Sequence, residues 1–416
     1  MKIRGIITVP PDKSISHRAI ILSSIASGVS EIHNLLASDD VLKTLNIMKA
    51  CGVTFEGDFD HLWVYPRGFK EPTQPLYCGN SGTTARLLTG LFSAQKGLFV
   101  LYGDRSLSER PMKRVIQPLL KMGAEILGRN GGENLPIAIR GRRLSGIEYT
   151  SQIASAQVKS AVILASLFAS SPTTYREPTK SRDHTERMLT QMGITVEIHE
   201  NTISVLPGRP SATKFVIPAD FSSAAFFITL GVLHPDAELT IRDVGLNPTR
   251  TGFLRILQRM GAHIETLHKD SGAEPHGDIK VSSSRLKGIE VNSTEIPTAI
   301  DEIPLIALLG VFAEGKTTVS GASELRYKES DRISSTVSEL KKMGAKIQEL
   351  PDGFVVEGTG ILHSSEVDAH KDHRIAMMLA IASLCTTDGE RSTIHGEEWV
   401  KISYPRFFET LKEVIR

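Results

Sequence analysis

Residues 155–165 read Ser155-Ala156-Gln157-Val158-Lys159-Ser160-Ala161-Val162-Ile163-Leu164-Ala165, a polar cluster that runs directly into an apolar helix pattern. The same arrangement recurs along the chain. The other polar openings are Lys13-Ser14-Ile15-Ser16-His17-Arg18, Asn80-Ser81-Gly82-Thr83-Thr84, Asp220-Phe221-Ser222-Ser223, Asp301-Glu302-Ile303-Pro304 and Asp372-His373-Arg374. Counted from residues 13, 81, 155, 220, 301 and 372, the steps are 68, 74, 65, 81 and 71 residues. Such regular spacing predicts a six-fold repeat.

A second signal has a similar period. Leu or Met, two further residues, Met or Cys, and then glycine occurs with glycines at 52, 123, 193, 261 and 344. Each glycine ends an amphipathic helix pattern and supplies the left-handed conformation by which a chain leaves a helix. A β-rich run follows each time. We therefore expect every repeat to combine strands, one helix buried nearly all round and one helix that packs a single face.

The last repeat ends at Arg416, before a strand could follow its second helix. Residues 2–9 form a strand pattern without a local partner, so we expect this strand to dock into the C-terminal half. Three repeats per lobe then predict one lobe at 12–218 and a second at 219–416 plus 1–11. Two chain crossings would link the lobes and act as a hinge, and closure on a ligand would exclude water.

Composition narrows the class of protein. The chain has 416 residues, of which 40% are hydrophobic and 23% charged, and its net charge is +1, so it offers no global field for nucleic acid or an anionic membrane. The sequence shows no secretion signal and no long apolar span, which favours a cytoplasmic location. Three cysteines without a Cys-x-x-Cys pair argue against a disulfide framework or a cysteine-based zinc site.

The polar openings carry more than helix caps. Ser, Thr, Asp and Asn are ordinary N-caps, and this explanation suffices for 220–223. It does not explain Lys13, Arg18 and Arg374, because cations at a helix N-terminus oppose the helix dipole. An anionic ligand would offset that repulsion. The segment 326–332 would bring Lys328 and Arg332 to one helix face if it is helical, although a solvated, salt-bridged turn is the alternative.

Six segments now support a specific resemblance. They are Pro11-Asp12-Lys13-Ser14-Ile15-Ser16-His17-Arg18, Gly79-Asn80-Ser81-Gly82-Thr83, Glu109-Arg110-Pro111, Ser155-Ala156-Gln157, Arg326-Tyr327-Lys328-Glu329-Ser330-Asp331-Arg332 and Asp372-His373-Arg374. In this order they resemble the signature segments of the 5-enolpyruvylshikimate-3-phosphate synthase family. The resemblance covers the whole chain. It implies an α/β enolpyruvyl transferase fold of two lobes, each of three βαβαββ repeats, with helix N-termini facing the interlobe cleft.

The resemblance also implies roles for individual residues. Lys13 would contact both substrates and take part in catalysis, while Ser14 and Arg18 would hold the shikimate carboxylate. The other contacts to shikimate-3-phosphate would come from Ser155, Ala156 through its backbone, Gln157, Ser181, Asp301 and Lys328. Phosphoenolpyruvate would be surrounded by Lys13, Gly82, Arg110, Gln157, Arg332 and Arg374. Asp301 would address the attacking 5-hydroxyl, and Glu329 would handle the proton at the vinyl methylene.

These residue types suit enolpyruvyl transfer, which needs an acid, a base directed at a hydroxyl, and a cage of cations. The resemblance implies two small-molecule substrates, no metal, no organic cofactor and a monomer. Ala156, Arg182 and Glu324 depart from the pattern of some members, which indicates a divergent bacterial-type branch. The register leaves open whether Lys401 contacts phosphoenolpyruvate.

Four alternatives stand beside this interpretation, and the nearest is an enzyme of the same kind of fold. The sister enzyme that acts on UDP-N-acetylglucosamine uses a mobile-loop cysteine, and residues 103–110 contain none. A protein that binds nucleotides or RNA ends would need a basic face or an aromatic stacking platform, for which seven Tyr and two Trp give little support. A non-catalytic anion-binding repeat protein would also carry cationic helix starts and stays an alternative. A purely structural scaffold would not need them.

Overall fold

The computed structural model describes residues 2–269 and 272–416, and the chain divides into two compact units. Unit 1 comprises the described residues of 1–10, 218–271 and 275–416, and unit 2 comprises 11–217 and 272–274. Each unit has a hydrophobic core of its own. Within the described residues, no helix combines the length and the apolar character that crossing a membrane would require.

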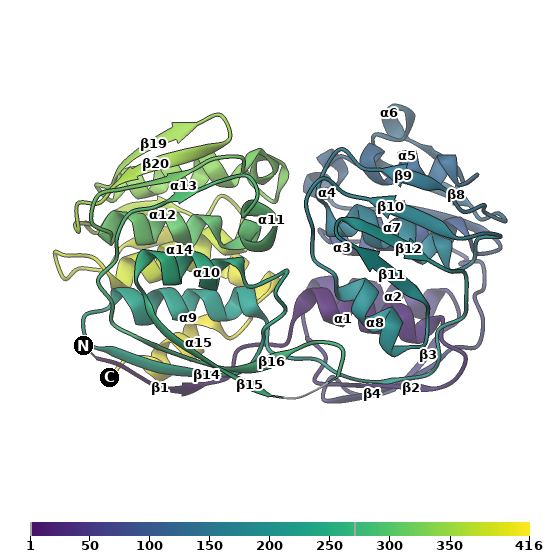
Figure 1. Ribbon diagram of the computed structural model, residues 1–416, viewed down its shortest axis with the longest axis horizontal. Helices are drawn as coiled ribbons and strands as arrows, with labels where there is room; N and C mark the ends of the chain where they lie inside the picture. Colours follow the sequence, from purple (N-terminus) through teal and green to yellow (C-terminus); the bar gives the residue numbers. More distant parts are fainter. Residues whose placement is uncertain (1, 270–271) are drawn as a thin grey trace. The chain divides into compact units, whose positions relative to one another are not determined.

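Unit 2 contains three four-stranded sheets of the same topology (Figure 1). In each, the first strand pairs in parallel with the second, and the remaining pairs are antiparallel. The sheets are, in spatial order, β13 (Lys214–Val216), β2 (Ser30–His33), β4 (His61–Tyr65) and β3 (Thr54–Gly57); β5 (Leu76–Tyr77), β6 (Leu98–Tyr102), β8 (Asn134–Arg140) and β7 (Glu125–Gly128); and β9 (Glu148–Thr150), β10 (Thr173–Arg176), β12 (Thr202–Val205) and β11 (Val196–His199).

Unit 1 repeats this topology twice and then shortens it. Its sheets are β1 (Ile3–Ile7), β14 (Ala237–Gly245), β16 (His276–Ser282) and β15 (His263–Lys269); β17 (Glu290–Val291), β18 (Lys316–Val319), β20 (Gly353–Glu357) and β19 (Lys346–Leu350); and the two-stranded pair β21 (Glu366–Asp368) and β22 (Thr393–His395). The shorter sheet belongs to the sixth repeat, in which the chain ends after its second helix.

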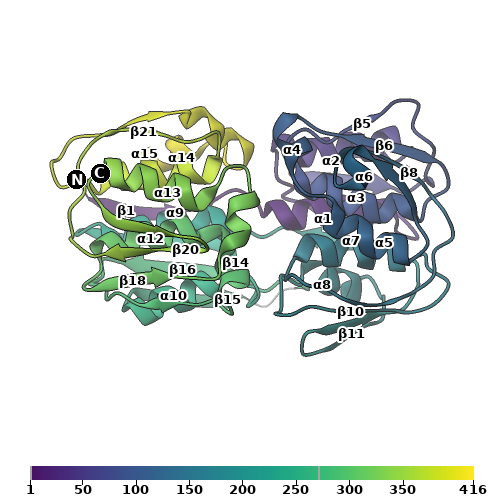
Figure 2. The ribbon, with the colours of Figure 1, turned by 90° about the horizontal axis from the view of Figure 1, so that it is seen from above.

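The two chain ends meet in unit 1. Strand β1 pairs in parallel with β14, and Ile3 also forms an antiparallel bridge with Ile415. Lys2 and Arg416 exchange backbone hydrogen bonds of 2.8 and 2.9 Å, and the two termini lie side by side in both views (Figures 1 and 2). The N-terminal strand therefore extends the sheet of the fourth repeat, and it contacts the sixth repeat through this bridge and through the helix α15 (Phe407–Val414). Strand β13 takes the equivalent place beside β2 in the first repeat.

Each repeat has the two kinds of helix expected from the sequence. The helices that follow the polar openings are buried, and they are α1 (Lys13–Ser24), α3 (Gly82–Ser93), α7 (Ala156–Ser166), α9 (Phe221–Leu233), α12 (Ile303–Phe312) and α14 (His373–Leu384). The second helices bury one face, and they are α2 (Asp39–Ala50), α5 (Lys113–Lys121), α8 (His184–Gln191), α10 (Gly252–Met260), α13 (Arg332–Lys342) and α15 (Phe407–Val414). Shorter helical segments are α4 (Arg105–Glu109), α6 (Arg129–Gly132), α11 (Ile296–Ala299), η1 (Ile300–Glu302), η2 (Ser323–Tyr327) and η3 (Glu397–Ile402).

The five repeated glycines have the expected conformation. Their φ angles are 95° at Gly52 and Gly123, 81° at Gly193, 92° at Gly261 and 90° at Gly344, all in the left-handed region. A strand begins shortly after each of them, as the sequence indicates. The predicted α/β fold of βαβαββ repeats is confirmed, with the sixth repeat lacking its last two strands.

Candidate functional site

The start of α3 in unit 2 brings two arginines to the backbone of Gly82. Ser81 caps the helix, because its Oγ accepts a hydrogen bond from Thr84 N at 3.2 Å. A Cβ added to Gly82 would lie 3.2 Å from Arg86 Nη1 and 3.5 Å from Arg110 Nη1. Two guanidinium groups therefore flank a helix start, whose first N–H groups have no partner within the helix. This combination suits an anion.

Neighbouring polar groups hold both arginines. Arg86 donates to Oε1 of Gln157, whose Nε2 donates to Thr83 Oγ1 at 3.0 Å. Arg110 donates to Asn80 Oδ1 at 2.5 Å. The structure thus brings Gly82, Arg110 and Gln157 together, and it adds Arg86, which the motif comparison did not assign.

Helix α1 carries Lys13, Ser14 and Arg18. The Nζ of Lys13 lies 3.2 Å from Asp40 Oδ2. Arg18 is 4% exposed and donates to the Ser14 carbonyl, to Ser160 Oγ at 2.8 Å and to Thr185 Oγ1 at 2.7 Å. Burial lowers the pKa of Arg18 to about 10, although acidic neighbours oppose the shift. The guanidinium is therefore held in place, and an anion that reached it would recover part of its lost solvation.

The start of α7 supplies the next predicted residues. Ser155 caps the helix through a 3.5 Å contact from Val158 N, and Ala156 and Gln157 form its first turn. One turn further, the buried Nζ of Lys159 lies 2.9 Å from Glu177 Oε1 and 2.8 Å from Glu186 Oε1.

This buried ion cluster reaches a predicted substrate contact. Glu177 accepts hydrogen bonds from the backbone N of Ser181 at 3.0 Å and from its Oγ at 2.6 Å, and Lys159 donates to the Ser181 carbonyl at 3.2 Å. The acidic neighbours outweigh the effect of burial and raise the pKa of Lys159. Ser181 is thus oriented by groups that are almost completely buried.

Unit 1 gathers its predicted residues around one guanidinium. Arg332, the first residue of α13, donates to Glu329 Oε2 at 2.6 Å, to Asp301 Oδ1 at 3.2 Å and to Asp372 Oδ2 at 2.7 Å. Nη2 of Arg374 lies 3.5 Å from the other oxygen of Asp301. Two guanidinium groups and three carboxylates therefore share one site.

Because this cluster is buried, each of its charged groups affects the pKa of the others. Burial by itself would lower the pKa of Arg332, but Asp372, Glu329 and Asp301 outweigh it and raise the pKa. Burial likewise opposes ionisation of Asp372, yet Arg332 holds the pKa of that carboxyl below its ordinary value. The pKa of Lys328 is lowered, first by burial, with Arg332 adding to the shift and Asp301 opposing it.

A second ion network lies behind Asp301. The fully buried Glu302 accepts from Arg250 at 3.1 Å and from Ser222 Oγ at 2.5 Å. Arg250 also lies 3.4 Å from Asp220 Oδ1, the N-cap of α9. Asp220 therefore has both the capping role expected of it and an ionic role.

Two local expectations in unit 1 are wrong. Asp301 does not open an apolar helix, because residues 300–302 form the turn η1 and α12 begins at Ile303. Lys328 and Arg332 do not share a helix face either, since α13 begins at Arg332 and Lys328 follows η2 in an extended conformation. A cap explains the second difference, because Asp331 accepts from the backbone N of Ile333 and of Ser334 and so starts the helix there.

The sequence contained a signal for the residues that motif comparison missed. Arg86 and Lys159 are single cations inside helices that are otherwise uncharged and largely buried. A charge in such a position needs a partner or a ligand. Their partners, Gln157 for one and Glu177 with Glu186 for the other, could not be named before the fold was known.

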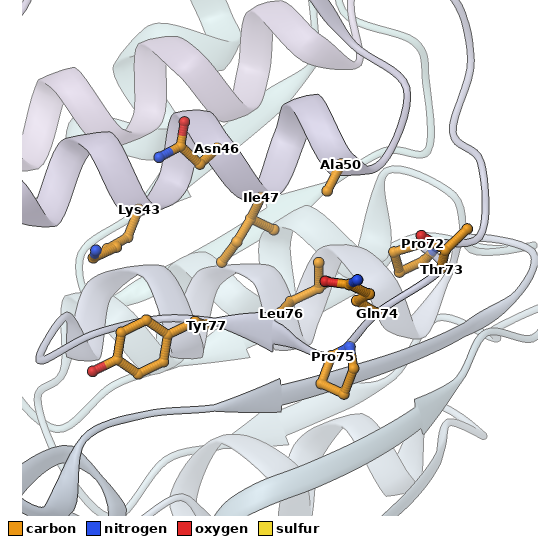
Figure 3. Close-up of a pocket in the computed structure, with 10 residues that line it drawn as sticks. All are labelled: Lys43, Asn46, Ile47, Ala50, Pro72, Thr73, Gln74, Pro75, Leu76 and Tyr77. Atoms are coloured by element: carbon orange, nitrogen blue, oxygen red, sulfur yellow. The ribbon is translucent and has the colours of Figure 1, made fainter.

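Unit 2 also has a pocket of about 360 Å³ that is lined by other residues. Figure 3 shows it between α2 and the segment 72–77. Its lining consists of Lys43, Asn46, Ile47, Ala50, Pro72, Thr73, Gln74, Pro75, Leu76 and Tyr77 and includes none of the predicted site residues. We therefore leave it out of the candidate site.

Comparison with known proteins identifies relatives of the whole chain. Residues 1–411 match the model of the family described as EPSP synthase (3-phosphoshikimate 1-carboxyvinyltransferase). A 3-phosphoshikimate 1-carboxyvinyltransferase of Thermotoga neapolitana is 48% identical, with 100% of this chain and 98% of the relative covered. The protein of that name from Thermodesulfovibrio yellowstonii is 50% identical, with coverage of 99% and 97%.

Solved structures with a similar fold also match this chain. An EPSP synthase from Acinetobacter baumannii has a TM-score of 0.88 and 41% identity, covering 99% of this chain and 96% of its own. An enolpyruvyl transferase from Streptomyces tendae has a TM-score of 0.80 at 18% identity, with coverage of 99% and 95%, and shows the shared fold.

Proposed function

Because the chain belongs to the EPSP synthase family, we infer that it transfers the enolpyruvyl group of phosphoenolpyruvate to the 5-hydroxyl of shikimate-3-phosphate and releases phosphate. This reaction serves the biosynthesis of aromatic amino acids. One observation supports the proposal most directly. Arg332 joins Asp301 and Glu329, the two carboxylates that the reaction needs as base and acid, in one buried site.

The proposed task of unit 2 is to bind the anionic parts of the substrates. Gly82 and Arg110, with Gln157, would hold phosphoenolpyruvate, and the planar fork of arginine matches a phosphate or carboxylate. Arg86 reinforces this group through Gln157. Ser14, Arg18, Ser155, Ala156, Gln157 and Ser181 would hold shikimate-3-phosphate, and Lys13 would contact both substrates.

The proposed task of unit 1 is proton transfer. A proton delivered by Glu329 to the methylene of phosphoenolpyruvate makes the adjacent carbon electrophilic, and the 5-hydroxyl of shikimate-3-phosphate adds to it. Asp301 would accept a hydrogen bond from this hydroxyl, and Lys328 would help to direct it. Loss of a proton from the new methyl group and departure of phosphate then restore the double bond. Arg332 and Arg374 would stabilise the phosphate and the carboxylate throughout.

The ion pair of Glu329 suggests how this residue becomes an acid. Arg332 favours the ionised form of Glu329 as long as the two groups are paired. An anionic substrate that takes over the guanidinium would remove this partner. The affinity of Glu329 for a proton would then rise at the moment when the acceptor carbon is in place.

The comparisons do not favour the alternative that acts on UDP-N-acetylglucosamine, since the relatives of high identity are named for the other reaction. A monomeric state and a cytoplasmic location stay predictions from the sequence.

The direct test is phosphate release by the purified chain. We expect release only when shikimate-3-phosphate and phosphoenolpyruvate are both present, with an equal amount of the enolpyruvyl product found by mass spectrometry. UDP-N-acetylglucosamine should not replace shikimate-3-phosphate. Phosphate release from phosphoenolpyruvate alone, or a product formed with the sugar nucleotide, would contradict the proposal.

A further inference from the structure

A histidine and glutamate cluster lies on the exposed face of the first sheet of unit 2, and it contains none of the residues assigned above. Glu31 and His33 belong to β2, and His61 belongs to the adjacent strand β4 (Figure 1). Nε2 of His33 and Nε2 of His61 each lie 3.2 Å from the same atom, Oε2 of Glu31. The ligand-type atoms of the three residues all lie within 4.8 Å of one another.

These distances fit a bound metal ion. Zinc binds histidine nitrogen and carboxylate oxygen at about 2.0–2.2 Å, so two ligands of a tetrahedral ion stand roughly 3.3–3.5 Å apart. The two measured separations of 3.2 Å are close to that edge. An ion between the three atoms would need only a small outward movement of the side chains. It would bind both histidines through unprotonated Nε2 atoms.

Strand pairing holds the three residues in place. His33 and His61 are direct partners in the antiparallel register of β2 and β4, and their rings stack with centroids 4.0 Å apart. Glu31 lies two residues before His33 and so on the same face of the sheet. The strands are fixed from the other face, where Ile32 and Leu62 are buried in the core. Asp58 also caps the turn before β4 by accepting from His61 N at 3.0 Å.

The charges around the cluster are compatible with a cation. Glu31 supplies a carboxylate beside the two imidazoles, and two histidines with one carboxylate are a known ligand set for zinc. Lys214, the partner of Glu31 on β13, adds a positive charge nearby that opposes metal binding. The three side chains are partly exposed, by 26% for His33, 35% for His61 and 42% for Glu31. An ion can therefore enter, and water can complete its coordination.

We propose that Glu31, His33 and His61 bind one divalent transition-metal ion of the zinc class, separate from the residues of the enolpyruvyl transfer. Imidazole nitrogen with a carboxylate favours zinc over calcium or magnesium, which prefer oxygen ligands throughout. The ion joins β2 to β4 beside the point where the chain leaves unit 2. There Ile217 N donates to the His33 carbonyl at 3.0 Å, and Asn34 Nδ2 donates to the Ile217 carbonyl at 2.8 Å. Its effect is to stabilise unit 2.

Calorimetric titration of the untagged chain with Zn²⁺ at neutral pH tests the proposal. We expect one ion per chain, and at least about tenfold weaker binding for His33→Gln and for His61→Gln, because each variant removes a ligand. Zn²⁺ should also raise the Tm of the wild-type chain by a few degrees and leave the Tm of both variants nearly unchanged.

The matched control is His395→Gln. His395 pairs with Glu366 on the surface of unit 1, and among the described residues this pair belongs to no group of three possible metal ligands. This variant should bind Zn²⁺ like the wild-type chain. The proposal is overturned if the wild-type chain binds no ion, if both His33→Gln and His61→Gln retain full affinity, or if His395→Gln loses as much affinity as they do. Circular dichroism of each variant establishes that the fold is intact.

Discussion

Arg332 and Glu329 are joined by a hydrogen bond of 2.6 Å between Nη2 and Oε2, inside a site where the arginine is 2% exposed. The same guanidinium holds Asp301 and Asp372. The proposed acid and the proposed base therefore depend on one cation, and a substrate anion that binds this cation changes the surroundings of both carboxylates at once.

Glu329→Gln should abolish proton delivery while the site keeps its shape, because the amide can still accept a hydrogen bond from Arg332. General acid catalysis contributes roughly 10²–10⁴-fold, so we expect turnover to fall at least about 100-fold. Turnover in deuterated water, followed by mass spectrometry, should show little label in the methylene group of the product and of recovered phosphoenolpyruvate. Label entry at the wild-type rate would show that another group delivers the proton.

Asp301→Asn is expected to fail at a different step. Removing this carboxylate weakens activation of the 5-hydroxyl, so addition should slow by a comparable factor while Glu329 still protonates phosphoenolpyruvate. The rate at which bound phosphoenolpyruvate exchanges label should then remain higher than in Glu329→Gln. Identical exchange defects in the two variants would remove the proposed division of roles.

Arg332→Met should destabilise unit 1 as well as inactivate it. The substitution leaves Asp372, whose side chain is 0% exposed, without its principal cation. Removing one partner of a buried ion pair costs about 3–5 kcal/mol. Urea unfolding should detect this loss. Arg406→Met is a suitable control, because Arg406 pairs with Glu409 at a site where the arginine is 70% exposed, and its loss should have a much smaller effect. Similar midpoints for the two variants would contradict the assignment.

Local chemistry explains why much of the fold could be predicted. Five of the helices predicted from polar clusters have a side-chain N-cap, and these caps are Asp12, Ser81, Ser155, Asp220 and Asp372. The repeated glycines end the second helices in the left-handed conformation. Caps and helix ends depend on residues within a few positions of one another, so a single sequence reveals them. Asp301 is the exception, because the turn η1 precedes its helix.

The side-chain networks depend on contacts that no local pattern encodes. Arg250 and Glu302 are 52 residues apart, and Arg18 and Ser160 are 142 residues apart. Glu31 and His61 come together only because β2 pairs with β4 in one particular register. Cysteine spacing gives no information on histidines and glutamates of neighbouring strands, so it does not indicate this cluster. Burial and pairing distance, which decide these contacts, become known only with the tertiary structure.

His17 predicts a pH dependence of stability in unit 2. Burial, followed by the charges of Lys13 and Arg18, lowers the pKa of His17 well below its ordinary value of 6.5. As the pH falls below 6.5, the unfolded chain binds a proton at this residue and the folded chain does not, so stability that is present above this pH is lost. At a pH one unit lower, the loss is about 1 kcal/mol.

The matched variant for this test is His17→Gln, whose amide can still hydrogen-bond to Thr44 in place of His17 Nδ1. Urea unfolding at pH values about one unit above and one unit below the ordinary histidine value should show a smaller decrease for the variant than for the wild-type chain. An equal decrease in both proteins would mean that other groups cause the pH dependence.

Arg110→Ala should weaken the binding of phosphoenolpyruvate far more than the binding of shikimate-3-phosphate. Arg110 Nη1 lies beside the first residue of α3, so its removal takes one guanidinium fork from the proposed phosphoenolpyruvate site and leaves Arg18 and Ser155 unchanged. A charge-assisted hydrogen bond contributes about 1.5–3 kcal/mol, which corresponds to a loss of affinity of at least about tenfold. Arg105→Ala is the control, because Arg105 lies on the neighbouring α4 with a side chain that is 95% exposed and forms a surface ion pair with Glu109. It should leave both affinities unchanged. Calorimetry with each ligand measures these losses, and equal weakening of the two substrates by Arg110→Ala would place this arginine outside the phosphoenolpyruvate site.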